Sequence, residues 1–115
     1  MRMRSLTVRL ATRDLARAIA FYRDVLGFGV ARAEESFAFV GAGDVELMFV
    51  HDPDANIPAV RGLVFVMQGV NELHARVAAE KIPVLWGPEV YDYGFREFSV
   101  ADPDGNELIF SEPAE

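Results

Sequence analysis

Cysteine is absent from this chain of 115 residues, and histidine occurs only twice. Without thiols, the protein can form neither a disulfide nor a thiolate site. Positive charge is also scarce, because eleven Lys and Arg against eighteen Asp and Glu leave a net charge of −7. Nucleic acid and anionic membranes repel such a chain, so we expect neither as a partner. The acidic excess mildly favours cationic partners.

Long apolar runs are missing as well. No stretch approaches the roughly 20 apolar residues that a membrane span needs. The start, Met1 to Arg4, is basic, but alternation rather than an apolar core follows it, so we expect no signal peptide and a cytoplasmic location. With 51% hydrophobic and 25% charged residues, the composition is typical of one globular domain.

The clearest local signal is the segment 95–111, FREFSVADPDGNELIFS. Pro103 presets φ for a turn and Gly105 supplies a left-handed residue, so two strands should meet there as a hairpin. Alternation predicts that Val100 lies opposite Leu108 and Phe98 opposite Phe110, on one apolar face. The other face is mixed, and we expect function there; its residues are Glu97, Ser99, Ala101, Glu107 and Ile109.

The first half of the chain begins with alternation over residues 6–10, which predicts a strand. Asp14 can cap a helix of about three turns that ends at Gly27. A short strand over 28–33 follows. Residues 37–40 and 45–50 then flank a four-residue loop, which would pair Phe39 with Glu46 and Phe37 with Met48. Those four share one face, and Ala38 and Leu47 fall on the other.

The second half repeats this order. After an aperiodic connection over 51–61, we expect a strand over 63–67, a helix from near Asn71 to Pro83, a strand over 84–86 and a loop over 87–94. The matching pairs lie 55 or 56 residues apart; they are Val8 and Val64, Leu15 and Val70, Ala18 and Leu73, and Tyr22 and Val77. Strand, helix, strand and hairpin thus occur twice, and each copy must associate with another to cover its sheet.

Two segments, 13–28 (RDLARAIAFYRDVLGF) and 96–106 (REFSVADPDGN), resemble the vicinal oxygen chelate superfamily of glyoxalase I, extradiol dioxygenases and bleomycin-resistance proteins. The resemblance covers essentially the whole chain. It implies an α+β fold of two tandem βαβββ modules, about 4–52 and 61–112, whose sheets curl around a groove with helices outside. It also implies a homodimer in which each groove combines the first module of one chain with the second of the other.

Superfamily enzymes place metal ligands at four matched strand positions, which by register fall here on Thr7, Glu46, Leu63 and Ile109. Only Glu46 is a good donor, whereas a catalytic metal needs three or four nitrogen or oxygen ligands. His51 is out of phase with Glu46, and His74 lies on the second helix near solvent. We therefore expect no metal and no cofactor.

The C-terminal half is most similar to bleomycin-resistance proteins, which hold a cationic, aromatic drug without chemistry. We therefore expect a protein that binds an amphipathic or cationic aromatic small molecule, through apolar contact, carboxylates and stacking rings. The candidate ligand-binding residues are Arg9, Phe37, Phe39, Glu46, Met48, Leu63, Phe65, Trp86, Tyr93, Glu97 and Ile109.

Other interpretations remain open at this stage. The Phe and Met side chains could pack a seam between modules, Glu46 could pair with Arg9, and Trp86 could be a core or dimer contact. Glu107 could be merely solvated. The protein could also be an enzyme, with unusual metal ligands or with Glu46 as a general base whose pKa is raised by burial. A third possibility is a module that docks another chain.

Overall fold

The computed structural model describes residues 1–54, 56 and 58–114, and the chain divides into two compact units, Met1–Ile57 and Pro58–Glu115. Unit 1 contains β1 (Thr7–Thr12), α1 (Leu15–Ala20), the π-helical segment η1 (Phe21–Val25), β2 (Gly29–Ala33), β3 (Phe37–Ala42) and β4 (Val45–His51). Unit 2 contains β5 (Leu63–Val66), α2 (Val70–Ala79), β6 (Val84–Val90), β7 (Phe95–Ala101) and β8 (Glu107–Pro113). No helix in the described part of the chain has the length and apolarity to cross a membrane.

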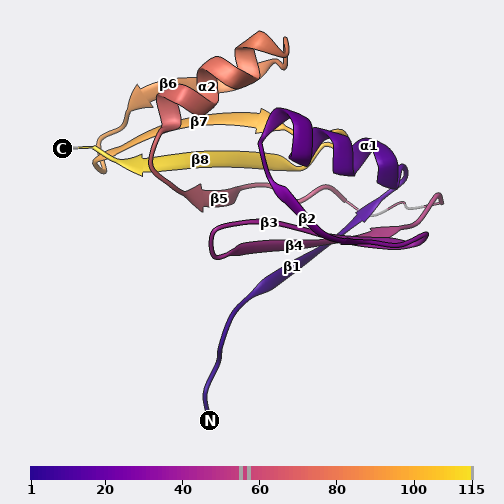
Figure 1. Cartoon of the computed structure of the whole chain (residues 1–115). Coiled ribbons are helices and arrows are strands. Elements are labelled where there is room, and N and C mark those ends of the chain that lie inside the picture. The colour runs from indigo at the N-terminus through magenta and orange to yellow at the C-terminus, as the bar shows by residue number, and fades with distance from the viewer. Residues whose placement is uncertain (55, 57, 115) are drawn as a thin grey trace. The chain divides into compact units, whose positions relative to one another are not determined.

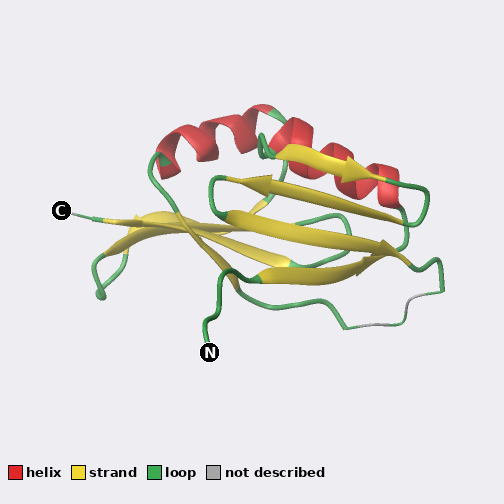
Figure 2. Ribbon diagram, turned by 60° about the horizontal axis from the view of Figure 1, so that its bottom comes forward, coloured by secondary structure: helices red, strands yellow, loops and turns green. Residues whose placement is uncertain are grey.

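The two units share one topology, which confirms the α+β fold of tandem βαβββ modules. Their sheets have the strand orders β1-β4-β3-β2 and β5-β8-β7-β6. In each, the first strand pairs in parallel with the last, and the other neighbours are antiparallel. The helix of each unit covers one face of its own sheet (Figures 1 and 2). We call the opposite face the front face.

The core of unit 1 forms between its helix and sheet. Asp14 caps α1 as predicted, because its Oδ1 accepts the backbone N–H of Arg17 at 3.0 Å; such a cap is worth about 1 kcal/mol. The helix continues through the π-helical turn η1, which periodicity did not predict. Tyr22 from η1 is fully buried and contacts the rings of Phe28 and Phe49. Gly27, at φ 80°, ends the helix.

The core of unit 2 confirms the predicted hairpin of β7 and β8. Val100 pairs with Leu108, and Phe98 with Phe110. All four are at most 1% exposed on the face that α2 covers. His74 of α2 is half-buried and lies edge-on to Phe98 at 5.4 Å, so only part of the residue is near solvent as expected.

The turn between β7 and β8 is held by two side chains. Asp102 Oδ1 accepts the backbone N–H groups of Asp104 and Asn106, each at 2.9 Å, and Asp102 Oδ2 accepts the Asn106 amide. Asn106 Oδ1 in turn accepts the N–H of Val60 at 2.8 Å. Gly105 has φ 85°, as the sequence predicted. Both polar side chains are buried, so they hold the turn from its inner side while Gly105 at its tip is exposed.

The hairpin of β3 and β4 differs from the prediction in register. Ala42 pairs with Val45, so the loop has two residues, Gly43 and Asp44, and not four. Phe39 therefore lies opposite Met48 rather than Glu46. A two-residue loop suits glycine with φ above zero, and Gly43 has φ 56°. The shift of two residues leaves every side chain on its predicted face.

The ends of several elements also differ. The first strand starts at Thr7, and Leu6, 78% exposed, lies outside it. Helix α2 starts at Val70 and ends at Ala79, before Pro83. Strand β6 runs to Val90 through the segment predicted as a loop, with bulges opposite β7. Gly87 permits this pairing, because a Cβ there would lie 2.2 Å from the carbonyl oxygen of Glu97.

Helix α2 begins on a carboxylate from the last strand. Glu112 of β8 accepts the backbone N–H groups of Gly69 and Val70 at 3.0 and 3.1 Å. These two hydrogen bonds hold the pKa of Glu112 below its ordinary value. Because free N–H groups at a helix start favour negative charge, this contact ties α2 to the sheet.

We expect Glu112→Gln to lower the melting temperature by a few degrees at neutral pH. Because the folded-state pKa of Glu112 is depressed, its contribution is fully present above the ordinary pKa of 4.5 and is lost as the pH falls through the folded-state value. The difference between the variant and the parent chain should therefore shrink in acid, as measured by thermal melts across pH. Glu35→Gln, at an exposed glutamate, is the control, and an equal loss there would contradict the assignment.

Candidate functional site

The front face of unit 1 is the side of its sheet that faces away from α1. Alternate residues Ala38, Val40, Leu47 and Phe49 are buried under the helix, so their neighbours point forward. The front-face residues of β1, β3 and β4 are Thr7, Arg9, Ala11, Phe37, Phe39, Glu46, Met48 and Val50. Five of the candidate residues therefore share one surface: Arg9, Phe37, Phe39, Glu46 and Met48.

Glu46 lies at the start of this face and is exposed in the single chain. The Thr7 hydroxyl donates to its Oε1 at 2.6 Å. In the described residues, Arg9 forms no ion pair with Glu46, so the suggested structural pair is not present. The burial that the general-base interpretation assumed for Glu46 is likewise not present in the single chain.

The aromatic part of this face lies on β3. The rings of Phe37 and Phe39 meet edge to face at 6.0 Å, and both are half-buried. The Arg32 guanidinium of β2 lies over the Phe37 ring at 5.1 Å. This cation–π contact already occupies one face of the Phe37 ring.

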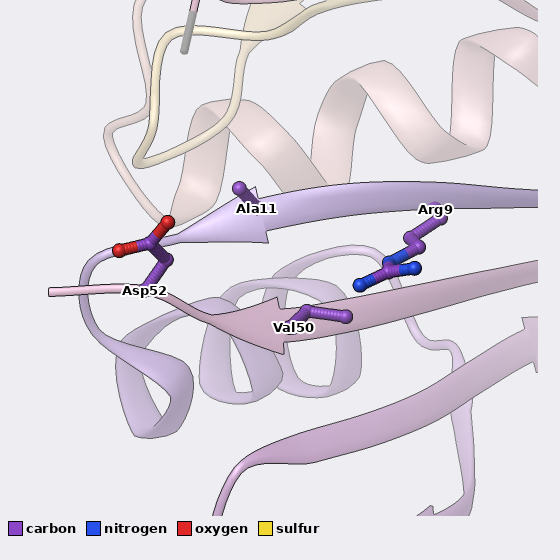
Figure 3. Close-up of a pocket in the computed structure, with 4 residues that line it drawn as sticks. All are labelled: Arg9, Ala11, Val50 and Asp52. Atoms are coloured by element: carbon purple, nitrogen blue, oxygen red, sulfur yellow. The ribbon is translucent and has the colours of Figure 1, made fainter. Parts of the chain in front are cut away.

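A cavity of about 270 Å³ opens on the same face, beside β1 and β4 (Figure 3). Its lining consists of Arg9, Ala11, Val50 and Asp52. Arg9 and Asp52 lie at its two ends, and the small apolar side chains lie between them (Figure 3).

The front face of unit 2 holds six polar and aromatic side chains, which we call the aromatic–acidic cluster: Trp86, Tyr91, Tyr93, Glu97, Ser99 and Glu107. Trp86 pairs with Ser99 across β6 and β7, so both point forward. The Trp86 indole and the Ser99 hydroxyl each donate to the same oxygen of Glu107, at 3.1 Å. Glu107 therefore fixes the plane of the indole ring, because rotation of the ring would break that hydrogen bond.

The second carboxylate of the cluster is Glu97, which is only 6% exposed, as its predicted position implied. It accepts a hydrogen bond from the Tyr93 hydroxyl. This hydrogen bond, with some burial, raises the pKa of Tyr93 to about 12. Among the described residues, no Lys or Arg pairs with Glu97 or Glu107, so the negative charge is held by neutral donors.

The aromatic rings of the cluster form a continuous row. Trp86 meets Tyr91 edge-on at 5.6 Å, and Tyr91 stacks on Tyr93 at 6.0 Å with 10° between the planes. Partial burial, together with the charge of Glu89, raises the pKa of Tyr91. Tyr93 is 63% exposed, so one end of the row is open to solvent.

The placement of β5 corrects part of the sequence interpretation. Leu63 pairs with Leu108, and Phe65 with Phe110, on which it stacks at 5.2 Å. Both therefore face α2, whereas Val64 shares the front face with Ile109. The expectation that Leu63 and Phe65 lie on the ligand face is wrong.

A sequence signal for this correction existed. The three matched pairs of helix residues are each 55 residues apart. The same spacing matches Val8 with Leu63, whereas the sequence interpretation matched Val8 with Val64. A shift of one residue along a strand moves all of its side chains to the opposite face of the sheet.

The metal centre of superfamily enzymes does not fit these residues. The front-facing residues of β5 beside Ile109 are Val64 and Val66, which offer no donor side chain. Within the described ranges, no three His, Cys, Asp or Glu side chains are grouped to hold a metal. His51 is exposed, with its Nε2 3.2 Å from the carbonyl oxygen of Arg13, and the half-buried His74 lies edge-on to Phe98.

Sequence reasoning undervalued three members of the cluster. Glu107 was considered solvated, but it is half-buried and accepts two hydrogen bonds. The predicted face of Glu107 was the only sequence feature that pointed to a role. Its contact with Trp86 could not be predicted, because the two residues are far apart along the chain. Tyr91 and Ser99 were likewise not chosen as site residues, although Ser99 is fully buried on the predicted front face.

The sequence matches the family model of the glyoxalase/bleomycin resistance protein/dioxygenase superfamily over residues 4–110. The chain therefore belongs to this superfamily, as the two motifs indicated. A comparison with curated proteins finds no match.

Solved structures show the same fold. The chain is similar to an antibiotic-binding protein from Streptomyces, with a TM-score of 0.84, 24% identity and 97% of each chain covered. It is also similar to the bleomycin resistance determinant encoded on transposon Tn5, with a TM-score of 0.81, 21% identity and coverages of 96% and 98%. A lactoylglutathione lyase from Agrobacterium tumefaciens gives a TM-score of 0.78 and 25% identity, with 93% and 91% covered.

We expect Tyr93 to remain protonated up to about pH 11, above the ordinary tyrosine pKa of about 10, because Glu97 accepts its hydroxyl proton. In Glu97→Gln the pKa of Tyr93 should fall toward the ordinary value. Titration of the tyrosine ring carbons by NMR measures this, and Tyr93→Phe assigns the resonance. Ionisation of Tyr93 near pH 10 in the unaltered chain would contradict the contact.

Proposed function

We propose that this protein binds a small cationic or amphipathic aromatic molecule without chemical change and without a metal. The observation that carries the proposal is the aromatic–acidic cluster of unit 2. It offers two carboxylates without basic partners, beside a row of three aromatic rings. Stacking suits the planar part of a ligand, and the carboxylates suit its positive group.

The state of the carboxylates supports a cationic ligand. Glu97 is buried and Glu107 is half-buried, and each is held by hydroxyl or indole donors. A carboxylate away from water is costly unless a positive charge or several hydrogen bonds compensate it. A bound cation would supply that compensation, because a charge-assisted hydrogen bond is about twice as strong as a neutral one.

The family relatives include proteins whose names state antibiotic binding and bleomycin resistance, and a bleomycin-binding protein complexed with bleomycin. They also include a lyase. The donor set favours the binding class here, since Glu46 is the one carboxylate among the four positions that the resemblance implies, Thr7, Glu46, Leu63 and Ile109. The exposure of Glu46 removes the reason to assign it as a general base.

The same proposal includes a homodimer, in which two chains, each with modules over about 4–52 and 61–112, associate. Val64 and Val66 on the front side of β5 are 54% and 68% exposed. Adjacent exposed valines on one strand are typical of a surface that a partner covers. A partner chain over these valines would also exclude water from the neighbouring Ile109.

We expect an anthracycline with a protonated amine to quench the fluorescence of Trp86, because that residue is the only tryptophan and lies in the cluster. Glu97→Gln and Glu107→Gln should each weaken binding by about tenfold, the effect of losing one charge-assisted contact. Fluorescence titration measures both affinities.

Two controls accompany this titration. The N-acetylated anthracycline keeps the planar rings but lacks the charge, so it should bind the parent chain and both variants alike. Glu35→Gln removes an exposed carboxylate outside the cluster and should leave the affinity unchanged. Equal weakening by all three substitutions, or no quenching near millimolar ligand, would contradict the proposal.

We also expect protein purified without chelator to contain far less than one zinc, nickel, manganese or iron ion per chain. Elemental analysis by mass spectrometry measures this content. Added metal should leave the melting temperature unchanged, because only ligands that bind the folded state raise it. A stoichiometric ion whose loss lowers the melting temperature would favour the enzyme interpretation instead.

A further inference from the structure

The cavity on the front face of unit 1 lies outside the aromatic–acidic cluster, and the proposed function does not use it. We propose that this cavity binds a small ω-amino carboxylate, with the acid group on Arg9 and the amino group at Asp52. The proposal stands independently of cation binding on unit 2. It rests on the charges at the two ends of the cavity, its size and its apolar middle (Figure 3).

Arg9 provides the acid-binding end. Its guanidinium is exposed, reaches along the sheet toward Val50, and forms no ion pair within the described residues (Figure 3). A planar guanidinium with five N–H donors is matched to a carboxylate, which it can grip by two parallel hydrogen bonds. Its neighbours Ala11 and Val50 cannot supply an acceptor from their side chains.

Asp52 provides the other end. It is half-buried, its backbone is fixed by the 2.8 Å hydrogen bond from its N–H to the carbonyl oxygen of Thr12, and its Oδ1 accepts the N–H of Asp54 at 3.2 Å. The remaining lone pairs of this carboxylate can accept from an ammonium group. In the described residues, no Lys or Arg forms an ion pair with Asp52, and Arg9 lies at the opposite end of the cavity.

The spacing along the chain guides the choice of ligand length. Val50 lies beside the Arg9 guanidinium (Figure 3), and Asp52 lies two residues further, directly after β4; two extended residues span roughly 7 Å. A chain of about four methylene groups between an acid and an amine spans a similar distance. The volume of about 270 Å³ lies below that of most drug-sized sites, so the occupant is small.

The test is an NMR titration of the full ¹⁵N-labelled chain with δ-aminovalerate, valerate and pentylamine. We expect δ-aminovalerate to bind most tightly, valerate about tenfold more weakly and pentylamine more weakly still, because each missing group removes one charged contact. The shifted resonances should lie on residues 9–12 and 50–52. Equal shifts from all three probes, or none, would overturn the proposal.

Three variants separate the two ends. Arg9→Gln should lose the binding of both acids, whereas Asp52→Asn should keep valerate binding and remove the advantage of the amino group. Arg32→Gln removes a second arginine from the same sheet without touching the cavity, so it should bind δ-aminovalerate as the parent chain does. A similar loss in Arg32→Gln would mean that only the general charge of the face attracts the acid.

Two variants distinguish a failure of this cavity proposal from a failure of the proposed function. Glu107→Gln should leave δ-aminovalerate binding unchanged, and Asp52→Asn should leave anthracycline binding unchanged. Melting temperatures of all variants show whether each is folded. If Arg9 and Asp52 bind each other in solution, δ-aminovalerate will cause no shifts and Asp52→Asn will strengthen valerate binding, which would also overturn the proposal.

Discussion

The register between β7 and β8 is the constraint on which the rest of unit 2 depends. Asp102 and Asn106 bind each other and the backbone within one turn, so Val100 can only meet Leu108. That pairing sends Phe98 and Phe110 toward α2 and leaves Glu97, Ser99 and Glu107 together on the front. A slip of one residue would bury two carboxylates under the helix and expose the rings to water, which no other contact could offset.

The carboxylates of unit 2 serve two different purposes. Glu112 lies under the start of α2, where two backbone N–H groups satisfy it and tie helix to sheet. Glu97 and Glu107 are held instead by side-chain donors, on a face with no helix. Glutamates of β7 and β8 therefore have different roles depending on the face of the sheet on which they lie: stability on the helix side and ligand recognition on the front.

Unit 1 has the same topology but different front-face chemistry. It exposes the guanidinium groups of Arg9 and Arg32 and the carboxylate of Glu46, which accepts a hydrogen bond from Thr7. Two copies of one module therefore offer surfaces of different chemistry: two carboxylates beside three rings on unit 2, and two arginines with a single glutamate on unit 1. Because a repeated backbone constrains only the buried positions, the front positions are free to differ in this way.

The sequence by itself determined the helix faces, the 95–111 hairpin with its pairing, the duplicated topology and the forward direction of Glu46 and Glu97, because alternation and turn chemistry act between near neighbours. Only the tertiary structure decided that Leu63 and Phe65 face α2, that Glu46 stays exposed and that Trp86 meets Glu107. These facts depend on which strand lies beside which, and in what register. Long-range pairing follows from the summed packing of whole sheets and not from any local pattern.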